Sequence, residues 1–470
     1  MWSRSGRCRK VRDVFTKGGF PDWRLDQFLD YMYKKKTDSF LQMNKFPKKL
    51  RQALVEELGP ETSTLKAVGE KRGGQAQKVL FETRDGHRIE AVSLDFKSHK
   101  SLCISSQAGC AFNCSFCATG KVGLKRQLSV DEITDQVLYF QQQRQKIDSI
   151  SFMGMGEPLA NPYVFDALSI LSDRSLFGMS PRRLNISTIG IFPGIKKLTE
   201  LHPQVNLAYS LHSPFPEERN ILVPANRLFP LEEAMELLDE RIAKTGRQVW
   251  LAYILLKDRT DSREHTEALV NLLKQRREAT RHLFHVNLLP YNAARGVEEN
   301  FVKVEDNKVL QFKRILDENR ISSSYRNSFG SEIDAACGQL FAEYEKTKTG
   351  ELFGMRRSSQ TMTLPRSPEV DMAPSSAPSV SVSGDAPTPL TGSTAEGGLD
   401  CKPHVEGNSV EETGREPRKS HVNREDERPA PPLHSTATAP RQSPDQRMGQ
   451  AARLVQIAGN RRRKELAAVI

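Results

Sequence analysis

The 470-residue chain is long enough for two or three domains, and 69 Lys and Arg against 58 Asp and Glu give a formal charge of +11 at pH 7. The charge suits a nucleic-acid partner, although it serves solubility equally well. No apolar run reaches the roughly 18 residues of a membrane-spanning helix, so we expect no membrane association. The basic start lacks the apolar stretch of a secretory signal. We therefore expect a cytoplasmic protein, with a mitochondrial presequence as the alternative because no acidic residue precedes Asp13.

Four zones follow one another along the chain. Residues 1–65 predict a small helical domain, with Asp22 as an N-cap and apolar residues among Lys34, Lys35 and Lys36. Its basic character indicates either an RNA-binding accessory domain or simple packing. Residues 66–100 predict a β-hairpin linker, because alternating apolar residues flank the turn signal Asp85–Gly86.

The middle zone, residues 101–349, alternates strand and helix patterns. Amphipathic stretches such as Val130–Gln143 and Leu231–Ala243 separate short apolar runs, which are Leu102–Ser105, Ile150–Met153, Leu184–Ser187, Val205–Leu211, Val249–Leu256 and Phe284–Leu289. This alternation predicts parallel βαβ units, hence an α/β barrel or a doubly wound sheet. Functional residues should then lie at the C-terminal ends of the strands. Residues 350–470 lose aromatic residues after Phe353 and predict a largely disordered tail.

The seven cysteines are unevenly placed. An odd number without a secretory signal disfavours a disulfide framework. Cys103, Cys110, Cys114 and Cys117 fall within fifteen residues, whereas Cys337 stands far downstream. This distribution favours metal binding or catalysis.

A C-x3-C-x2-C loop, formed by Cys110, Cys114 and Cys117, directly follows a predicted strand. Three thiolates can hold three irons of a 4Fe–4S cluster and leave the fourth iron open to a small chelating ligand. A structural zinc site is the alternative, but zinc prefers four closed ligands.

The cysteine loop, with Phe116 before its last cysteine, resembles the radical S-adenosylmethionine superfamily. The resemblance implies an open (β/α)6 barrel, a cluster that chelates the amino and carboxylate groups of S-adenosylmethionine, and cleavage to a 5′-deoxyadenosyl radical. Later matches in SFMGMGEPLAN, RRLNISTIG, YSLHSP and LLPYN lie at strand ends. By this resemblance the cofactor-binding residues are Gly156, Glu157, Ser187, Ser210, Leu211, His212 and Asn292.

From about Trp23 to Tyr344 the chain resembles the RlmN/Cfr family of RNA adenine methyltransferases, most specifically in SEIDAACGQLF and LCISSQ. The family's scheme makes Cys337 the carrier, as an S-methylcysteine, of a methyl group from one S-adenosylmethionine. A second S-adenosylmethionine in the same turnover activates that group for addition to the base. Glu90 is then the proton acceptor, and Cys103 closes a transient disulfide with Cys337. Reduction of this disulfide implies a flavodoxin- or thioredoxin-like electron donor.

The resemblance also implies the substrates. These are an adenine in the peptidyl-transferase region of large-subunit rRNA and an adenine beside the tRNA anticodon. We expect the protein to act as a monomer. Pro158 after Glu157 follows the pattern of the carbon-2 branch, which we favour. VDEITDQVLYF and VNLAYSLHSPFPEER resemble the Cfr branch, which methylates carbon 8. A radical activase and a zinc-stabilised RNA-binding protein remain as alternatives of other classes.

Overall fold

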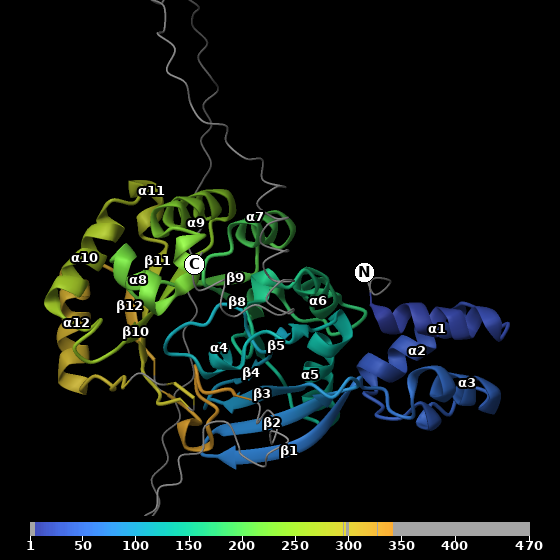
Figure 1. Cartoon of the computed structure of the whole chain (residues 1–470). Helices are drawn as coiled ribbons and strands as arrows, with labels where there is room; N and C mark the ends of the chain where they lie inside the picture. The colour runs from blue at the N-terminus through green and yellow to red at the C-terminus, as the bar shows by residue number, and fades with distance from the viewer. Residues whose placement is uncertain (1–4, 295, 298–299, 327, 342–470) are drawn as a thin grey trace, which may run out of the picture. The chain divides into compact units, whose positions relative to one another are not determined.

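The computed structural model describes residues 5–294, 296–297, 300–326 and 328–341 (Figure 1). The tail predicted for residues 350–470 lies outside the described residues. Within the described ranges, no helix is both long enough and apolar enough to cross a bilayer.

The chain begins with a group of short helices. They are α1 (Gly6–Lys17), α2 (Trp23–Leu29), a π-helical turn (Asp30–Lys34), a 3-10 turn (Phe40–Gln42) and α3 (Lys48–Leu58). Sequence analysis did not predict α1, although Cys8, Val11 and Phe15 at helical spacing are all buried. The Ser5 hydroxyl caps α1 by accepting from the Cys8 N–H at 2.9 Å. Asp22 precedes α2 as predicted, but its side chain makes no capping hydrogen bond.

A ten-stranded mixed sheet forms the body of the fold. Its first part is antiparallel and contains β1 (Leu65–Gly73), β2 (Ala76–Thr83), β3 (Arg88–Asp95) and β4 (Lys100–Cys103). The predicted hairpin is β2 and β3. Strand β1 was missed because only Leu65 in it is buried, so its sequence carries no alternating pattern.

The second part of the sheet is parallel. From β4 onward the strands pair in chain order with β7 (Ser149–Phe152), β8 (Leu184–Thr188), β9 (Asn206–Ser210), β10 (Val249–Leu255), β11 (Phe284–Pro290) and β12 (Ser323–Tyr325). β1 and β12 stand at opposite edges of the pairing order, so the described sheet is open. The predicted α/β partial barrel is thus confirmed.

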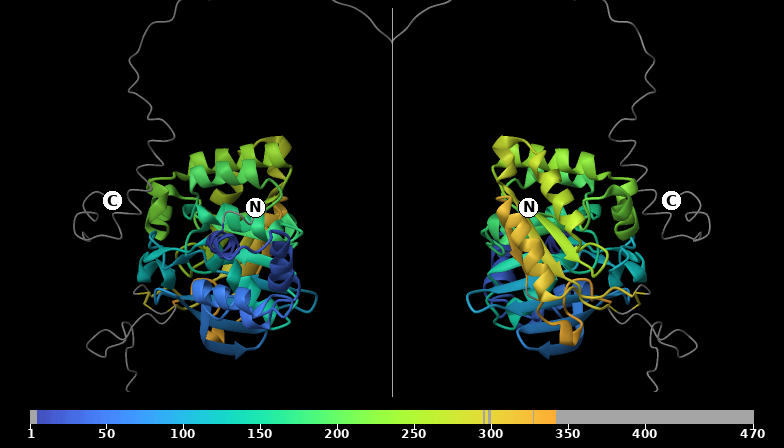
Figure 2. Two further views of the ribbon diagram at one scale, coloured as in Figure 1. Left: turned by 90° about the vertical axis from the view of Figure 1, so that its right-hand side faces the viewer. Right: turned by 90° about the vertical axis from the view of Figure 1, so that its left-hand side faces the viewer.

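Helices connect the parallel strands. The longer ones are α5 (Val130–Gln142), α6 (Tyr163–Ser172), α7 (Phe192–Leu201), α9 (Leu231–Thr245), α10 (Arg263–Lys274) and α12 (Asp306–Glu318). Helix α12 packs on α10 and on strand β12, and it faces the viewer in the right-hand view of Figure 2. The short elements are β5 (Gln107–Ala108), α4 (Ala118–Val122), β6 (Arg126–Gln127), α8 (Pro216–Leu222), α11 (Glu278–Arg281) and the 3-10 turns Pro158–Ala160, Pro181–Arg183, Pro224–Arg227 and Ser331–Ile333.

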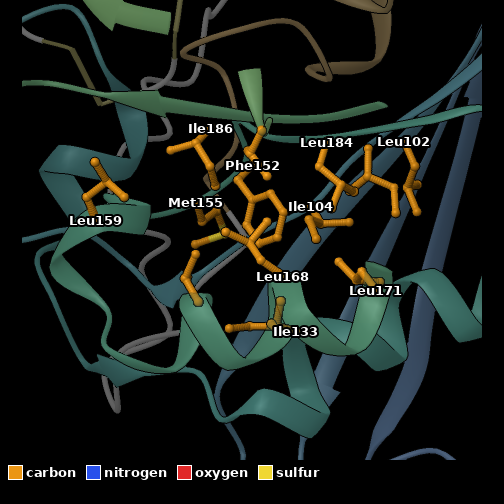
Figure 3. Close-up of a cluster of buried hydrophobic side chains, with 14 of the residues drawn as sticks. Leu102, Ile104, Ile133, Phe152, Met155, Leu159, Leu168, Leu171, Leu184 and Ile186 are labelled. Carbon is orange, nitrogen blue, oxygen red and sulfur yellow. The ribbon is translucent and has the colours of Figure 1, made fainter. Parts of the chain in front are cut away.

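A dry apolar layer fixes the strands (Figure 3). Leu102 of β4, Phe152 of β7 and Ile186 of β8 are at most 1 % exposed, and Ile133 of α5 and Leu168 of α6 are fully buried with them. Burying one such side chain stabilises the fold by about 1.5–3 kcal/mol. The C-terminal ends of these strands are therefore held on a rigid base.

A buried ion pair joins α1 to α5. The Arg7 guanidinium contacts the Asp135 carboxylate, and both side chains are at most 2 % exposed. Asp135 also accepts from the backbone N–H and the hydroxyl of Thr64, at 2.6 and 2.7 Å. The Arg7 N–H donates to Asp131 at 2.8 Å.

We expect Asp135→Ala to destabilise the protein by about 3–5 kcal/mol, because it leaves the Arg7 charge buried without its partner. Chemical denaturation of the purified protein measures the change. The matched control is the Arg7→Met/Asp135→Leu double variant, which removes both charges and should recover most of the loss. If the single variant were no less stable than the double one, the pair would have no such role.

Candidate active site

The predicted cluster ligands lie on one tight loop between β5 and α4. Gly109 at its start has φ of +79°, and a Cβ there would lie 1.9 Å from the Gly123 carbonyl oxygen, so only glycine fits. The Cys117 N–H donates to the Cys114 carbonyl at 3.2 Å. The loop therefore folds back on itself and brings its cysteines onto one short segment.

The three thiols are free in this structure, and their chemistry suits iron. Burial raises the pKa of Cys110 to about 12, and nearby Cys117 raises it further. Burial is likewise the first cause that raises the pKa of Cys114, followed by Cys117 and Cys110. Such thiols keep their protons at pH 7, and a bound metal ion would take the place of those protons. Among the described residues, no group of three or more His, Cys, Asp or Glu side chains has a geometry ready to hold a metal. The donor set nevertheless matches three corners of a 4Fe–4S cluster.

Gly156 and Glu157 follow β7 and occupy a close backbone approach. Gly156 has φ of +99°, and a Cβ there would lie 2.5 Å from the Gln107 Cβ, so a side chain is excluded. The Glu157 N–H donates to Gln107 Oε1 at 2.8 Å. Its carboxylate accepts from the N–H groups of Leu159 and Ile189, at 3.1 and 3.0 Å. Burial raises the pKa of Glu157 to about 7. This buried carboxylate already accepts from two backbone N–H groups and can also accept from a ligand amine.

Ser187, Ser210 and Leu211 stand at the ends of β8 and β9. The two serine hydroxyls are 3.5 Å apart and partly buried, so both can face a common ligand. Leu211 is fully buried, its N–H donates to Ala252 at 3.0 Å, and its carbonyl accepts from Arg219. Leu211 therefore holds the turn and presents no free polar group.

His212 connects this turn to the cysteine loop. It has φ of +62°, and its Nδ1 accepts from the Ile254 N–H at 3.2 Å, which leaves the proton on Nε2. Its ring meets that of Phe116 edge-on, with centroids 4.8 Å apart. Burial lowers the pKa of His212 to about 3, so the ring is neutral at pH 7.

Cys337 lies against the cysteine loop. The Ala118 N–H donates to the Gly338 carbonyl at 2.9 Å, and the Thr119 hydroxyl donates to the Leu340 carbonyl at 2.6 Å. Cys337 itself is exposed between buried neighbours. Asn292, after β11, donates to the Cys337 carbonyl at 3.5 Å. The structure thus brings Asn292, Cys337 and the cysteine loop together.

Cys103, at the C-terminal end of β4, shares a small pocket of about 50 Å³ with Cys337, Asn292 and Arg326. Both thiols are free. Burial raises the pKa of Cys103 to about 12, with a further contribution from Cys337, while the charge of Arg326 opposes the shift. Two thiols that influence one another across a pocket are well placed to exchange a sulfur bond.

Glu90 is the site residue that the structure does not place with the thiols. It lines a second pocket of about 300 Å³, formed by the β-sheet face of β1–β3 and the segment 334–341. Its carboxylate pairs with Lys78 Nζ at 2.9 Å and accepts from the Phe341 N–H at 3.0 Å. Glu90 does not line the pocket of Cys103 and Cys337.

Three residues of the site were missed by sequence analysis. Gln107, which holds Glu157, stands inside the LCISSQ match but has no chemistry that singles it out. Arg326 lies beside Cys103 without any motif. Arg219 sits in the charged run PEER, which predicts a solvated face, yet it is fully buried.

Known proteins are similar to this chain in sequence and in fold. The profile of the Radical SAM superfamily matches residues 104–271. The chain is 51 % identical over 334 residues to the Ribosomal RNA large subunit methyltransferase Cfr of Lachnoclostridium phytofermentans, with 71 % of this chain and 97 % of the relative covered. The Staphylococcus aureus protein of the same name is 46 % identical over 340 residues, with 72 % and 97 % covered.

A solved structure also matches. It is a radical SAM methyltransferase from Sphaerobacter thermophilus, with a TM-score of 0.67 and 33 % identity, and the match covers 73 % of this chain and 99 % of that one. The chain belongs to the RlmN/Cfr family of radical S-adenosylmethionine methyltransferases, whose cofactors are a 4Fe–4S cluster and two molecules of S-adenosylmethionine per cycle.

Proposed function

We propose that this protein methylates an adenine of large-subunit ribosomal RNA. The observation that carries the proposal is the pocket shared by Cys103 and Cys337, next to a loop with three further thiols. The names of relatives that are 46–51 % identical support an rRNA substrate. Neither a radical activase nor a zinc-stabilised RNA-binding protein needs the second pair of thiols.

The proposed cofactor contacts follow from the strand ends. Cys110, Cys114 and Cys117 would hold the cluster, which with S-adenosylmethionine supplies the methyl group and the radical chemistry. Glu157 would accept a hydrogen bond from the cofactor amino group, and Gly156 would let the cofactor approach the backbone closely. Ser187, Ser210 and Asn292 offer hydroxyl and amide groups at neighbouring strand ends. Leu211 and His212 hold the turn between them.

Cys337 is proposed as the carrier because its thiol is exposed and adjoins the cysteine loop. As a thiolate it attacks a methyl group and becomes S-methylcysteine. Release of the product breaks the bond between the Cys337 sulfur and the carbon joined to the base. Cys103, as a thiolate, would attack the Cys337 sulfur. The electron pair of the broken sulfur–carbon bond would stay on the carbon, which takes up a proton and becomes the methyl group, and two electrons from a flavodoxin- or thioredoxin-like donor would then reduce the disulfide.

Glu90 is kept as the proposed proton acceptor, with one structural condition. Its carboxylate is engaged by Lys78 and the Phe341 N–H, in a pocket that adjoins the segment carrying Cys337. The condition is that RNA must bring the ring proton to a carboxylate that already accepts these two contacts, which use one lone pair on each oxygen and make Glu90 a weaker base.

Two positions on the adenine ring are candidates. Pro158 predicts methylation of carbon 2. On that reading, tRNA is expected as a second substrate. Carbon 8 is supported by the name Cfr on the relatives, together with the Cfr-like segments of this chain. We give carbon 8 more weight, because the identity extends over the whole matched region whereas Pro158 is one residue.

Reconstitution under anaerobic conditions tests the function. The protein, loaded with iron and sulfide, is incubated with S-adenosylmethionine, a reductant and ribosomal or transfer RNA, and nucleosides are analysed by mass spectrometry. We expect 8-methyladenosine from rRNA. Exclusive 2-methyladenosine would return the assignment to the carbon-2 branch, and no methylated adenosine from either RNA would refute the proposed function.

The pH dependence of S-adenosylmethionine binding tests Glu157. A ligand amine that donates a hydrogen bond to Glu157 favours the carboxylate form of a group whose pKa burial has raised to about 7. The dissociation constant should therefore rise as pH falls below 7, approaching about tenfold per unit. His212 does not titrate in this range, because burial lowers its pKa to about 3. Equilibrium binding to the cluster-loaded protein between pH 5.5 and 8 measures the slope. Glu157→Gln should bind more weakly with no slope, and a flat profile in the unaltered protein would contradict the assignment.

The remaining assignments concern partners. We propose that residues 1–65 contact RNA and that 66–100 link them to the 101–349 barrel, in a cytoplasmic monomer. Trp23 is 55 % exposed, and the Arg24 guanidinium lies 4.5 Å from its ring centroid, an arrangement on which a base can stack. Lys34 and Lys35 are exposed nearby in sequence and suit phosphate.

A further inference from the structure

Arg219, in the short helix α8, is with Arg241 one of the two arginines that are less than 2 % exposed among the described residues. Its guanidinium donates to three strand-end carbonyls: Ile189 and Ser210, both at 2.9 Å, and Leu211 at 3.0 Å. A fourth contact goes to the side-chain oxygen of Asn226. One cation thus ties together the ends of β8 and β9, where the proposed cofactor contacts lie.

These acceptors are neutral. Over the residues that the structure describes, no Asp or Glu carboxylate lies within ion-pair distance of Arg219, and the Tyr209 ring, 5.0 Å away, supplies only a π face. A buried charge without a counter-charge is expensive, so a negative charge bound nearby would reduce this cost. Burial lowers the pKa of Arg219, as expected for an incompletely compensated cation.

Two neighbouring sources of negative charge act on Arg219 from beyond ion-pair distance, the cysteine loop and, with a smaller influence, Glu232 of α9. The Ser115 N–H, between Cys114 and Phe116, donates at 3.0 Å to the carbonyl of Leu222, at the end of α8. The loop is therefore docked on the helix that carries Arg219. A second contact lies on the other side of the clamp: His212, the residue after the Leu211 carbonyl that Arg219 binds, packs its ring edge-on against Phe116 of the cysteine loop, with centroids 4.8 Å apart.

We propose that Arg219 is the counter-charge of the iron–sulfur cluster and, through the same guanidinium, the clamp that positions the cofactor-binding strand ends. The inference rests on the proposed assignment of Cys110, Cys114 and Cys117 as cluster ligands. Three thiolates give the cluster a negative charge that increases when it accepts an electron. A nearby buried cation stabilises the reduced form and raises the reduction potential.

Two substitutions separate the roles. Arg219→Gln removes the charge. Arg219→Lys keeps the charge, but a single ammonium group cannot donate to all the carbonyls that the planar guanidinium binds at once. Arg241→Gln is the matched control. Arg241, in α9, is also buried and donates to neutral oxygens, the Thr199 hydroxyl at 3.0 Å and the Val205 carbonyl at 2.6 Å. No cysteine is among the groups that shift its pKa.

The experiment uses the cluster-loaded full chain. Iron content and visible absorbance establish the cluster, a redox titration followed by electron paramagnetic resonance gives its midpoint potential, and equilibrium binding gives the affinity for S-adenosylmethionine. For Arg219→Gln we expect a tenfold lower equilibrium constant for cluster reduction, which is about 59 mV for one electron. For Arg219→Lys we expect an almost unchanged potential but at least tenfold weaker cofactor binding. Arg241→Gln should change neither.

The outcomes are distinguishable. An unaltered protein that binds no cluster would refute the cluster assignment itself. The counter-charge role alone would be overturned by either of two results. One is an unchanged reduction potential in Arg219→Gln, and the other is an equal shift of the potential in Arg241→Gln. If Arg219→Gln fails to fold, Arg219→Lys decides, because a tenfold change in its reduction equilibrium would contradict a role based on charge. Unchanged cofactor binding in Arg219→Lys would overturn the clamp.

Discussion

Replacing Cys337 by alanine is expected to abolish RNA methylation, with a loss of at least about 10³-fold, because no other described thiol is both exposed and joined to the cysteine loop. S-methylcysteine should also disappear from peptide digests of protein incubated with S-adenosylmethionine. The iron content should stay unchanged, since Cys337 lies outside the C-x3-C-x2-C loop. Nucleoside mass spectrometry after a reconstituted reaction measures the loss.

Cys8→Ala is the control for this prediction. Cys8 is a fully buried thiol of α1 and packs in the N-terminal helices, so its loss should affect stability but not the chemistry. Cys103→Ala should differ from both: methyl transfer to Cys337 proceeds, but release stalls, and a covalent protein–RNA adduct accumulates. Methylated adenine at normal yield from the Cys337→Ala protein would exclude the carrier role.

The second large effect is expected for Cys114→Ala. Removing one of three thiolates leaves too few ligands to retain the cluster, so iron content should fall by about tenfold from its full 4Fe–4S complement. The brown absorbance and the ability to cleave S-adenosylmethionine should be lost with it. Anaerobic reconstitution followed by iron and sulfide analysis measures this.

Cys103→Ala is the matched control here, because Cys103 lies only seven positions before Cys110 yet stands on β4 and not in the loop. It should keep its iron. If Cys114→Ala retained full iron while Cys103→Ala lost it, the ligand set would have to be reassigned to include β4. Equal retention in both would exclude a cluster held by this loop.

The parallel part of the fold could be predicted from sequence because its strands are short, buried and rich in apolar residues. The run Phe284–Leu289 became β11, and Val249–Leu256 became β10, with ends shifted by only one residue. Since parallel strands end on one edge, the residues that follow them had to gather there. Thus Glu157, Ser187 and Ser210 could be grouped without knowing any distance.

The rest of the site depends on contacts that no local pattern encodes. Arg219 is in a run of charged residues and has the same local sequence character as a solvated arginine; only the docking of α8 under the cysteine loop buries it. Glu90 was assigned from resemblance, and its pairing with Lys78 across β2 and β3 depends on strand register. β1 is exposed along most of its length, so its pairing with β2 determines it and its own composition does not.

The hydrogen bond from the Thr119 hydroxyl to the Leu340 carbonyl has a consequence for biosynthesis. Its partners are 221 residues apart in the chain. At about 5–20 residues per second, a ribosome takes about 10–45 s to make the segment that separates them. During that interval the nascent chain carries the cysteine loop without the strand-end segment that later covers it. Metal delivery can therefore find a more open loop on the growing chain than on the finished protein, where residues 337–340 lie against it.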